Sequence, residues 1–439
     1  MKTNKEISIQ PENSFADQRV IIKLSGFDSK QKVTLRSEMS NYYCVNVPYY
    51  MSTSIGEKSV WESFAVFEAD NKGIIDVSTQ APISGMYSGV DSMGLFWTMK
   101  IKKAEVEEKP LKLVDIKINR NYIITFTAEV NGEVVATQQH IRNLINPKVK
   151  IVDVNEDGLV ARYFTMDNDI AKPAIIVVSG SDGGINKAQT ISALLASYDY
   201  SVLALSYFDL EDLPNGIEKI PLEYIEKAIK WTKNQKTITK DKICIYGRSK
   251  GGELALLSAT KFHEIRAVIA HTPSVFINQG LNKDRKPSKC SSWTYEGKEL
   301  PYLKISFSAI LKYIIKKLLK KPVKISDLYK HSLENNKKAE NFMIPVEKIN
   351  GPILLISAED DAVWPSTIFC QKTIERLNHY GFNNHYEHFS YENAGHYITL
   401  PYQPIPTLQG NGGDYKSNEI AAENSWGKTI AFLKMHFPT

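Results

Sequence analysis

Short hydrophobic–polar alternations fill the first 147 residues, with the period of two that is typical of half-buried strands. They occur at residues 20–27, 32–39, 62–69 and 122–130. Asn131-Gly132 separates the last alternation from VVATQQHI, and both residues tolerate the positive φ angles of a tight hairpin turn. Short strands with turns between them and no helical period predict an immunoglobulin-like β-sandwich over residues 1–147.

After residue 147 the pattern changes to unbroken apolar runs, which lie at residues 174–180, 201–208, 242–247, 267–272 and 352–359. Helix-like stretches follow the first three runs, at residues 188–197, 222–234 and 252–260. Apolar strands that alternate with helices are typical of a mostly parallel sheet covered on both faces. We therefore predict an α/β domain over residues 148–439. The pattern breaks at residues 274–349, which we interpret as a cap-like insertion over the site.

The composition is that of a globular protein, with 43% hydrophobic and 23% charged residues, and excludes a disordered or collagen-like chain. Four widely spaced cysteines without a CxxC pair exclude a disulfide scaffold and favour reduced thiols in the cytoplasm. There is no HExxH motif or paired Cys/His spacing, so we expect no metal. We also expect no secretory signal and no membrane span, because no apolar run reaches about 18 residues.

The positive charge is concentrated at residues 304–324, which contain seven lysines and no acid. Three interpretations remain open: a solvated helix face, a basic rim for an anionic ligand, and a peripheral contact with a membrane surface. The second interpretation makes four lysines candidates for binding phosphate groups of a ligand: Lys316, Lys317, Lys320 and Lys321. A nucleic-acid partner is disfavoured, because no known nucleic-acid-binding fingerprint accompanies the patch.

The strongest chemical signal is the GxSxG motif at residues 247–251, between a predicted strand and a predicted helix. A sharp turn there would push the side chain of Ser249 out at the top of the sheet, and the flanking glycines would prevent clashes in the bend. The helix N-terminus offers free N–H groups for a developing oxyanion. We predict that Ser249 is a nucleophile; the alternative is a helix N-cap serine.

A nucleophilic serine needs a base, and the base needs an acid that orients it. In α/β-hydrolases the chain order is nucleophile, acid, histidine. Asp360 and Asp361 both follow the last apolar run, and we favour Asp361 because the AVWP turn comes directly after it. His396 is the predicted base, since Gly395 before it would let the backbone bring the imidazole close to the nucleophile.

The oxyanion hole should use the backbone N–H of Lys250, the residue after the nucleophile. The second donor should come from the glycine-rich loop at residues 179–184. Ser181 and Asp182 are both candidates, and the sequence does not distinguish between them.

Seven stretches spread over the whole chain are similar to one known family. They are WESFAVFEADNKGIIDV (61–77), PISGMYSGVDSMGLFW (82–97), LALSYFDLEDLPN (203–215), YGRSKGGELAL (246–256), SSWTYEGKELPYL (291–303), EDDAVWPS (359–366) and NAGHYITLPYQP (393–404). Through them the chain resembles the acyl-CoA thioesterase / bile acid-CoA:amino acid N-acyltransferase family, as a bacterial type I acyl-CoA thioesterase.

The resemblance implies a β-sandwich domain followed by an α/β-hydrolase domain, with acyl-CoA bound near their junction. It also implies that Ser249, Asp361 and His396 form a catalytic triad. In this family, members with a serine nucleophile mostly hydrolyse acyl-CoA, whereas the bile-acid-conjugating branch uses cysteine and transfers the acyl group to glycine or taurine. A serine therefore favours hydrolysis to a free fatty acid and CoA through an acyl-serine intermediate.

Under this hypothesis CoA is part of the substrate, and no separate cofactor is expected. The alternatives are a carboxylesterase and an acyl-CoA:amine N-acyltransferase that use the same three residues. A protein that binds acyl ligands without catalysis is disfavoured, because all three polar partners are present. The sequence indicates neither the acyl-chain length nor the oligomeric state.

Overall fold

The computed structural model describes residues 4–48, 51, 55–106, 111–168 and 170–439. The chain divides into two compact units. The first unit comprises Met1–Lys109, Ile118–Pro147 and Thr399–Thr407, and the second comprises Pro110–Lys117, Lys148–Ile398 and Leu408–Thr439. The predicted boundary at residue 147 therefore misplaces two short segments. Pro110–Lys117 precedes the boundary but belongs to the second unit, and Thr399–Thr407 follows it but belongs to the first.

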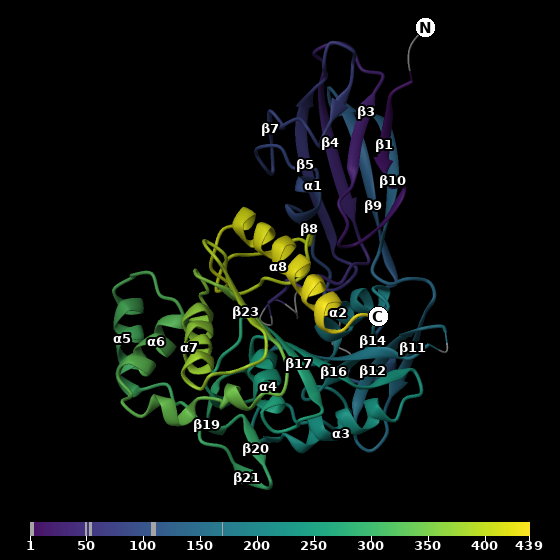
Figure 1. Ribbon diagram of the computed structural model, residues 1–439. Coiled ribbons are helices and arrows are strands. Elements are labelled where there is room, and N and C mark those ends of the chain that lie inside the picture. The colour runs from purple at the N-terminus through teal and green to yellow at the C-terminus, as the bar shows by residue number, and fades with distance from the viewer. Residues whose placement is uncertain (1–3, 49–50, 52–54, 107–110, 169) are drawn as a thin grey trace. The chain divides into compact units, whose positions relative to one another are not determined.

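The first unit is a β-sandwich of two sheets (Figure 1). The smaller sheet has the strand order β1 (Glu6–Gln10), β3 (Ile21–Ser25) and β6 (Ile75–Asp76). The larger sheet has the order β2 (Asn13–Phe15), β10 (Glu133–Asn143), β9 (Asn121–Val130), β4 (Lys32–Met39), β5 (Val60–Glu68) and β7 (Ser84–Gly85), with β8 (Lys100–Lys103) also paired to β5. A four-residue helix, α1 (Gly94–Trp97), precedes β8.

The strands of this unit show the alternation expected from the sequence. β4 and β5 bury every second residue, because successive side chains of a strand point to opposite faces of the sheet. The predicted hairpin joins β9 and β10, which pair antiparallel from Val130 and Glu133. Asn131 and Gly132 have φ angles of 53° and 84°, so the hairpin turn that the sequence predicted is confirmed.

The second unit is built on a sheet of eight strands, parallel except at one edge (Figure 1). The strand order is β11 (Val149–Val154), β12 (Val160–Met166), β14 (Ser201–Ser206), β13 (Lys172–Val178), β16 (Ile238–Arg248), β17 (Ile265–His271), β22 (Ile353–Ala358) and β23 (Tyr386–Tyr391). β12 pairs antiparallel with both of its neighbours, β11 and β14, and the strands from β14 to β23 run parallel. This topology is that of an α/β-hydrolase, as the sequence predicted.

Helices cover both faces of the eight-stranded sheet. One face carries α3 (Glu223–Lys233), α4 (Lys250–Ala259) and α7 (Ser366–His379), and the other carries α2 (Asn186–Ser197) and α8 (Tyr415–His436). The strands explain this division, because alternate residues point to opposite faces. Ile245 of β16 joins the core under α4, whereas His271 of β17 faces α8 and bonds to Thr429 through Nε2 and Oγ1, 3.1 Å apart.

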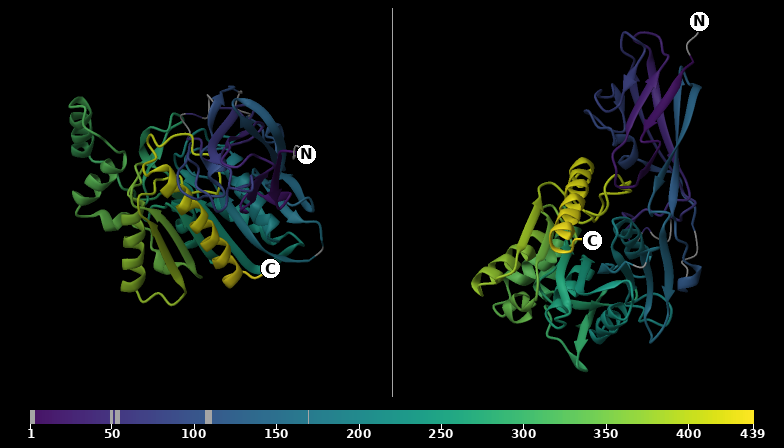
Figure 2. Two further views of the ribbon diagram at one scale, coloured as in Figure 1. Left: turned by 90° about the horizontal axis from the view of Figure 1, so that it is seen from above. Right: turned by 45° about the vertical axis from the view of Figure 1, so that its right-hand side comes forward.

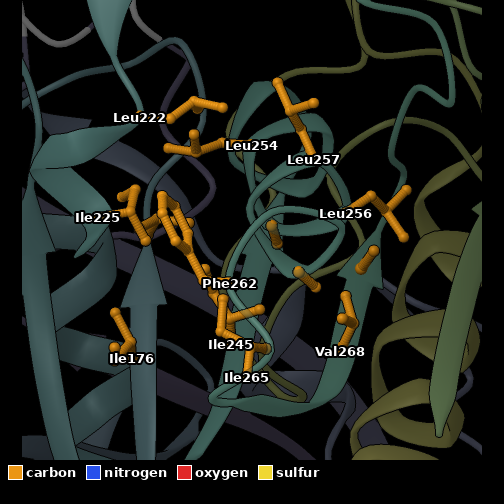
Figure 3. Close-up of a cluster of buried hydrophobic side chains, with 14 of the residues drawn as sticks. Ile176, Leu222, Ile225, Ile245, Leu254, Leu256, Leu257, Phe262, Ile265 and Val268 are labelled. Atoms are coloured by element: carbon orange, nitrogen blue, oxygen red, sulfur yellow. The ribbon is translucent and has the colours of Figure 1, made fainter. Parts of the chain in front are cut away.

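The core under α4 fixes the helix that follows the candidate nucleophile (Figure 3). All ten residues of α4 are buried, and Leu254, Leu256 and Leu257 belong to the same cluster of buried side chains as the strand residues Ile245 and Val268. Burial of each leucine side chain contributes about 1.5–3 kcal/mol. The packing therefore holds the N-terminus of α4 firmly at the end of β16.

The insertion between β17 and β22 contains short strands and two helices. Its elements are β18 (Gln279–Leu281), β19 (Pro287–Ser291), β20 (Trp293–Tyr295), β21 (Lys298–Glu299), α5 (Phe307–Leu318), α6 (Ser326–Glu334) and the 3₁₀ turns η3 (Ala339–Phe342) and η4 (Val346–Lys348). β20 also pairs with β15 (Ile220–Pro221), and the 3₁₀ turn η2 (Leu113–Asp115) belongs to the second unit. α5 and α6 lie side by side at the outer end of this unit, next to α7 (Figures 1 and 2).

None of the helices among the described residues has the length and apolar character that a bilayer-spanning segment needs.

Candidate active site

Ser249 occupies the sharp turn between β16 and α4. Its φ and ψ angles are 56° and −122°, a conformation that residues other than glycine adopt only under strain. A Cβ atom on Gly247 would lie 2.0 Å from the carbonyl oxygen of Gly251, and one on Gly251 would lie 2.3 Å from that of Ser179. The backbone therefore leaves no room for a side chain at either glycine, for the reason inferred from the sequence.

Ser249 and Asp361 bond to opposite nitrogens of the His396 imidazole. Nε2 lies 2.8 Å from Oγ of Ser249, and Nδ1 lies 2.8 Å from Oδ2 of Asp361. Because a carboxylate can only accept, Nδ1–H donates to Asp361 and leaves Nε2 to accept the hydroxyl proton of Ser249. The three residues are only 7%, 3% and 3% exposed, so these bonds form in a low-dielectric environment that strengthens them.

The sheet topology explains why three residues so far apart in sequence meet. Ser249 follows β16, Asp361 follows β22, and His396 follows β23. These strands are parallel, so their carboxyl ends lie along the same edge of the sheet. The hydrogen-bonded row that we expected from the sequence is present.

The structure separates the two neighbouring aspartates that the sequence left as alternatives. Oδ1 of Asp361 accepts from the backbone N–H of Val363 at 2.9 Å and of Trp364 at 3.2 Å, which leaves Oδ2 for the imidazole. Asp360 instead pairs with Lys324 and accepts from the backbone N–H of Gly413. Of the two, Asp361 is the residue in contact with His396.

Trp364, which the sequence predicted only as part of a turn, supports both Asp361 and His396. Its indole Nε1 donates to the carbonyl of Thr272 at 2.8 Å, and its ring meets the imidazole of His396 edge-on at 6.0 Å between centroids. The AVWP sequence therefore shapes the loop around Asp361 and one wall of the imidazole site.

The expected oxyanion loop lies beside the nucleophile. Lys250 is the first residue of α4, so its N–H has no acceptor within the helix. A Cβ atom on Gly180 would lie 3.1 Å from Cβ of Ser249, so the backbone at Gly180 approaches the nucleophile closely. Ser181 follows directly, and its carbonyl oxygen is held by Nε of Arg285 at 2.7 Å.

Asp182 uses its side chain for a buried ion pair. Its carboxylate lies 2.9 Å from Nζ of Lys187. Burial acts to raise the pKa of Asp182, but Lys187, Arg248 and His396 outweigh it and hold this pKa below the usual value. Asp182 is thus an anion that neutralises cations at the edge of the site.

The sequence analysis missed a polar network beneath the nucleophile. Nζ of Lys250 lies 2.8 Å from both carboxylate oxygens of Glu253. Glu253 also accepts from Trp293 Nε1 at 2.8 Å and from Asn278 Nδ2 at 2.9 Å, both in the insertion. Burial lowers the pKa of Lys250, and Glu253 counteracts that effect. A lone glutamate within the apolar stretch ELALL was the signal that could have revealed this network.

The lysines predicted to bind phosphate groups lie elsewhere. Lys316 and Lys317 are in the last turn of α5, and Lys320 and Lys321 follow it. Lys316 pairs with Asp327 at 3.3 Å. Within the described residues, none of the four forms a hydrogen bond or an ion pair with Ser249, Asp361 or His396, so their binding of a phosphate-bearing ligand stays a prediction.

Two family models match separate parts of the chain. The profile described as "BAAT / Acyl-CoA thioester hydrolase C terminal" matches residues 220–439, and the one described as "Acyl-CoA thioester hydrolase/BAAT N-terminal region" matches residues 17–156. The chain belongs to the BAAT / acyl-CoA thioester hydrolase family. The resemblance inferred from the sequence is therefore confirmed.

Two relatives from Mus musculus represent both kinds of activity named in this family. A peroxisomal succinyl-coenzyme A thioesterase is 26% identical and covers 98% of this chain and 96% of its own length. Acyl-coenzyme A amino acid N-acyltransferase 2 is 27% identical, with 97% and 96% covered. Overall identity therefore does not separate hydrolysis from transfer.

Among solved structures, a Pyrobaculum calidifontis esterase is 14% identical and covers 66% of this chain and 86% of its own, with a TM-score of 0.39. The fold assignment rests on the sheet topology of the second unit.

Proposed function

We propose that this member of the BAAT / acyl-CoA thioester hydrolase family hydrolyses acyl-CoA thioesters to a free fatty acid and CoA. The observation that carries the proposal is a serine hydroxyl, and not a thiol, bonded to His396 at 2.8 Å in a chain related to named acyl-CoA thioesterases. A thioester intermediate on cysteine would stay reactive towards an amine, whereas an acyl-serine ester is commonly resolved by activated water.

In the proposed first half-reaction, His396 takes the proton of Ser249 while Oγ attacks the thioester carbonyl carbon. The N–H of Lys250 stabilises the oxyanion. We favour Ser181 over Asp182 as the second donor, because it directly follows Gly180, where the backbone approaches the nucleophile. Each donor contributes about 3–4 kcal/mol of transition-state stabilisation. The C–S bond then breaks, and His396 returns the proton to the departing CoA sulfur.

In the second half-reaction, His396 takes a proton from water, and the resulting hydroxide attacks the acyl-serine carbonyl. The C–O bond to Ser249 breaks, and the same proton returns to Oγ. Asp361 stabilises the imidazolium in both halves. Nucleophile, base and orienting acid all come from the chain, so we propose that the reaction needs no cofactor beyond the CoA of the substrate.

The proposal is tested by measuring CoA thiol release from a panel of acyl-CoAs. We expect Ser249→Ala to lower kcat by about 10⁶-fold with an unchanged folded state, because the residues of a triad act as a unit. Turnover of every acyl-CoA at the wild-type rate in this variant would reject the scheme. A wild-type preference for simple esters over every acyl-CoA would favour the carboxylesterase alternative.

A second candidate, acyl transfer to an amine, is supported by the 27% identity to a named amino acid N-acyltransferase. Product analysis with glycine and taurine present separates it from hydrolysis. We expect free acid from the wild type and an increased share of amide from Ser249→Cys, since a thioester is the better acyl donor to amines. Amide as the main wild-type product would favour the second candidate.

We further propose that the protein acts in the cytoplasm. All four cysteines lie in the described residues, none forms a disulfide, and Cys44, Cys244 and Cys370 are buried. Reduced, buried thiols suit a reducing compartment. Fractionation of the source cells with an antibody to the chain tests this.

A further inference from the structure

α5 presents a continuous apolar stripe to solvent. Its members are Phe307, Ile310, Leu311, Ile314, Ile315 and Leu318, and their exposed fractions range from 41% for Ile310 to 78% for Phe307. Spacings of three and four residues place them on one side of the helix. Ala309, on the opposite side, is buried, and α6 is the helix that packs against α5. The stripe is therefore additional to the core contact of α5.

Lysines border this stripe on both sides. At 3.6 residues per turn the six apolar residues span an arc of about 140°, with Lys312 beyond one edge and Lys317 beyond the other. Lys320 and Lys321 extend the positive charge past the end of the helix. Among the described residues, these four lysines form no ion pair with an acidic side chain, whereas Lys316 pairs with Asp327.

We propose that α5 is an interfacial helix that docks this protein on the surface of an anionic lipid bilayer. The apolar stripe enters the boundary of the acyl chains, and the bordering lysines extend to the phosphate groups. The 12-residue helix is about 18 Å long, shorter than the roughly 30 Å hydrocarbon core, so it lies in the plane of the membrane.

The distribution of charge favours a bilayer over a second copy of the chain. A two-fold contact through the stripe would bring the same lysine-bordered surface together twice, with like charges facing each other. Anionic headgroups complement those charges. A merely solvated helix face would not carry large apolar side chains at all six of these positions.

The segment that joins α5 to α6 and the first turn of α6 contact the loop that carries the candidate catalytic acid. Lys324 pairs with Asp360, and the backbone N–H of Ser326 donates to the carbonyl of Ala362 at 3.0 Å. The ring of Tyr329 meets that of Trp364 edge-on, with the ring centroids 6.1 Å apart. Docking through α5 would thus hold this loop near a bilayer from which a long-chain acyl thioester could be drawn. This consequence rests on the proposed function, whereas the docking itself does not.

Sedimentation of the full chain with vesicles tests the docking. We expect the wild type to sediment with phosphatidylcholine vesicles that contain phosphatidylglycerol, more weakly with phosphatidylcholine alone, and less at high salt because lysine contacts are screened. Absence of the wild type from the anionic-vesicle pellet would overturn the proposal.

Serine substitutions in the stripe test the apolar part. Each of Leu311→Ser, Ile314→Ser and Leu318→Ser should weaken vesicle binding by about tenfold, the loss expected for one buried aliphatic side chain. Turnover of a short, water-soluble acyl-CoA should stay at the wild-type rate, which separates loss of docking from failure of the proposed function. Ile420→Ser on α8, where the isoleucine is 54% exposed, is the matched control and should bind vesicles normally.

Glutamine substitutions test the charged part. Lys312→Gln and Lys317→Gln should each lower binding to anionic vesicles about fivefold, and Lys416→Gln and Lys434→Gln on α8 should not. Normal vesicle binding of both the serine and the glutamine variants would overturn the proposal. So would an α5-dependent dimer that does not bind vesicles, or lysine variants that only raise KM for soluble acyl-CoA.

Discussion

The turn at Ser249 and the helix α5 are two regions of one structural unit that satisfy opposite requirements. Around Ser249 the charged groups are buried and matched: Lys250 with Glu253, and Asp361 with His396. Along α5 the large apolar side chains are exposed, and within the described residues several lysines form no ion pair with an acidic side chain. The polar groups of the first region find their partners within the chain, whereas the exposed side chains of the second are suited to contact with another molecule or surface.

The comparison teaches how the function of each region can be recognised. A buried ionic network tolerates little change, because a charge left without its partner in the interior is strongly unfavourable. An exposed apolar stripe adds little to stability, so its presence indicates selection for a contact. The following predictions test this contrast, from the largest expected effect to the smallest.

The largest contrast lies between the two adjacent aspartates. Asp361→Asn should lower kcat for acyl-CoA hydrolysis by about 10⁴-fold, because an amide favours the wrong histidine tautomer and cannot stabilise the imidazolium. Asp360→Asn should lower kcat by less than about tenfold, because Asp360 does not contact His396, its pair with Lys324 is half-exposed, and an amide oxygen can still accept from the N–H of Gly413. Steady-state kinetics measure both variants, and comparable losses would contradict the assignment of the acid.

The buried network beneath the nucleophile should dominate stability. Glu253→Ala should lower the free energy of unfolding by about 3–5 kcal/mol, because it leaves the Lys250 ammonium buried without its partner. Glu226→Ala is the matched control, since Glu226 forms a pair of the same kind with Lys230 on the exposed side of α3, and it should cost less than about 1 kcal/mol. Denaturant unfolding measures both, and equal losses would show that the network is not buried.

Leucines of the two regions should also differ. Leu256→Ala on α4 should destabilise the protein by about 2–5 kcal/mol, because it leaves a cavity in the packed core. Leu311→Ala on α5 should change stability by no more than about 0.5 kcal/mol, because its side chain is already 47% exposed. A large loss in the second variant would show that the stripe packs within the protein and would also contradict docking on a membrane.

The smallest effect concerns acid sensitivity behind the nucleophile. Burial and Arg248 lower the pKa of His271 to about 3. As the pH falls below about 6.5, the unfolded chain binds a proton at this residue and the folded chain does not, so stability falls with pH. His271→Gln removes this contribution. The difference in free energy of unfolding between the wild type and this variant should therefore shrink by up to about 1.4 kcal/mol for each unit by which the pH falls in that range.

Unfolding curves between about pH 7 and pH 4 measure this change. A deficit that stays constant over the range would show that His271 is protonated in the folded protein.

Much of the second unit was predictable because its signals are local. The runs at 174–180 and 201–208 became β13 and β14, and the stretch at 188–197 became α2, since continuous apolar strands and helical periods depend on neighbours in the sequence. Element ends were less accurate: β16 begins at Ile238, four residues before the predicted strand, and α4 begins directly after Ser249. Strand ends depend on pairing with other strands, which a single stretch does not reveal.

Residues that act through long-range contacts were harder to predict. Glu253 looked like one acid in an apolar helix until Trp293 and Asn278, distant in sequence, were found bonded to it. A single boundary at residue 147 would place Pro110–Lys117 in the first unit and Thr399–Thr407 in the second, but the structure places each in the other unit. No local pattern encodes such exchanges.

The sequence alone determined the alternation of apolar strands and helices in much of the second unit, the GxSxG turn and the family resemblance, because each depends on residues that are adjacent in the chain. Only the tertiary structure decided that Asp361 and not Asp360 contacts His396, that Lys250 and Glu253 pair in the interior, and that the stripe of α5 faces solvent. The physical reason is the same in each case. Which group is buried, and beside what, depends on the sheet register and helix packing that bring distant residues to the same place.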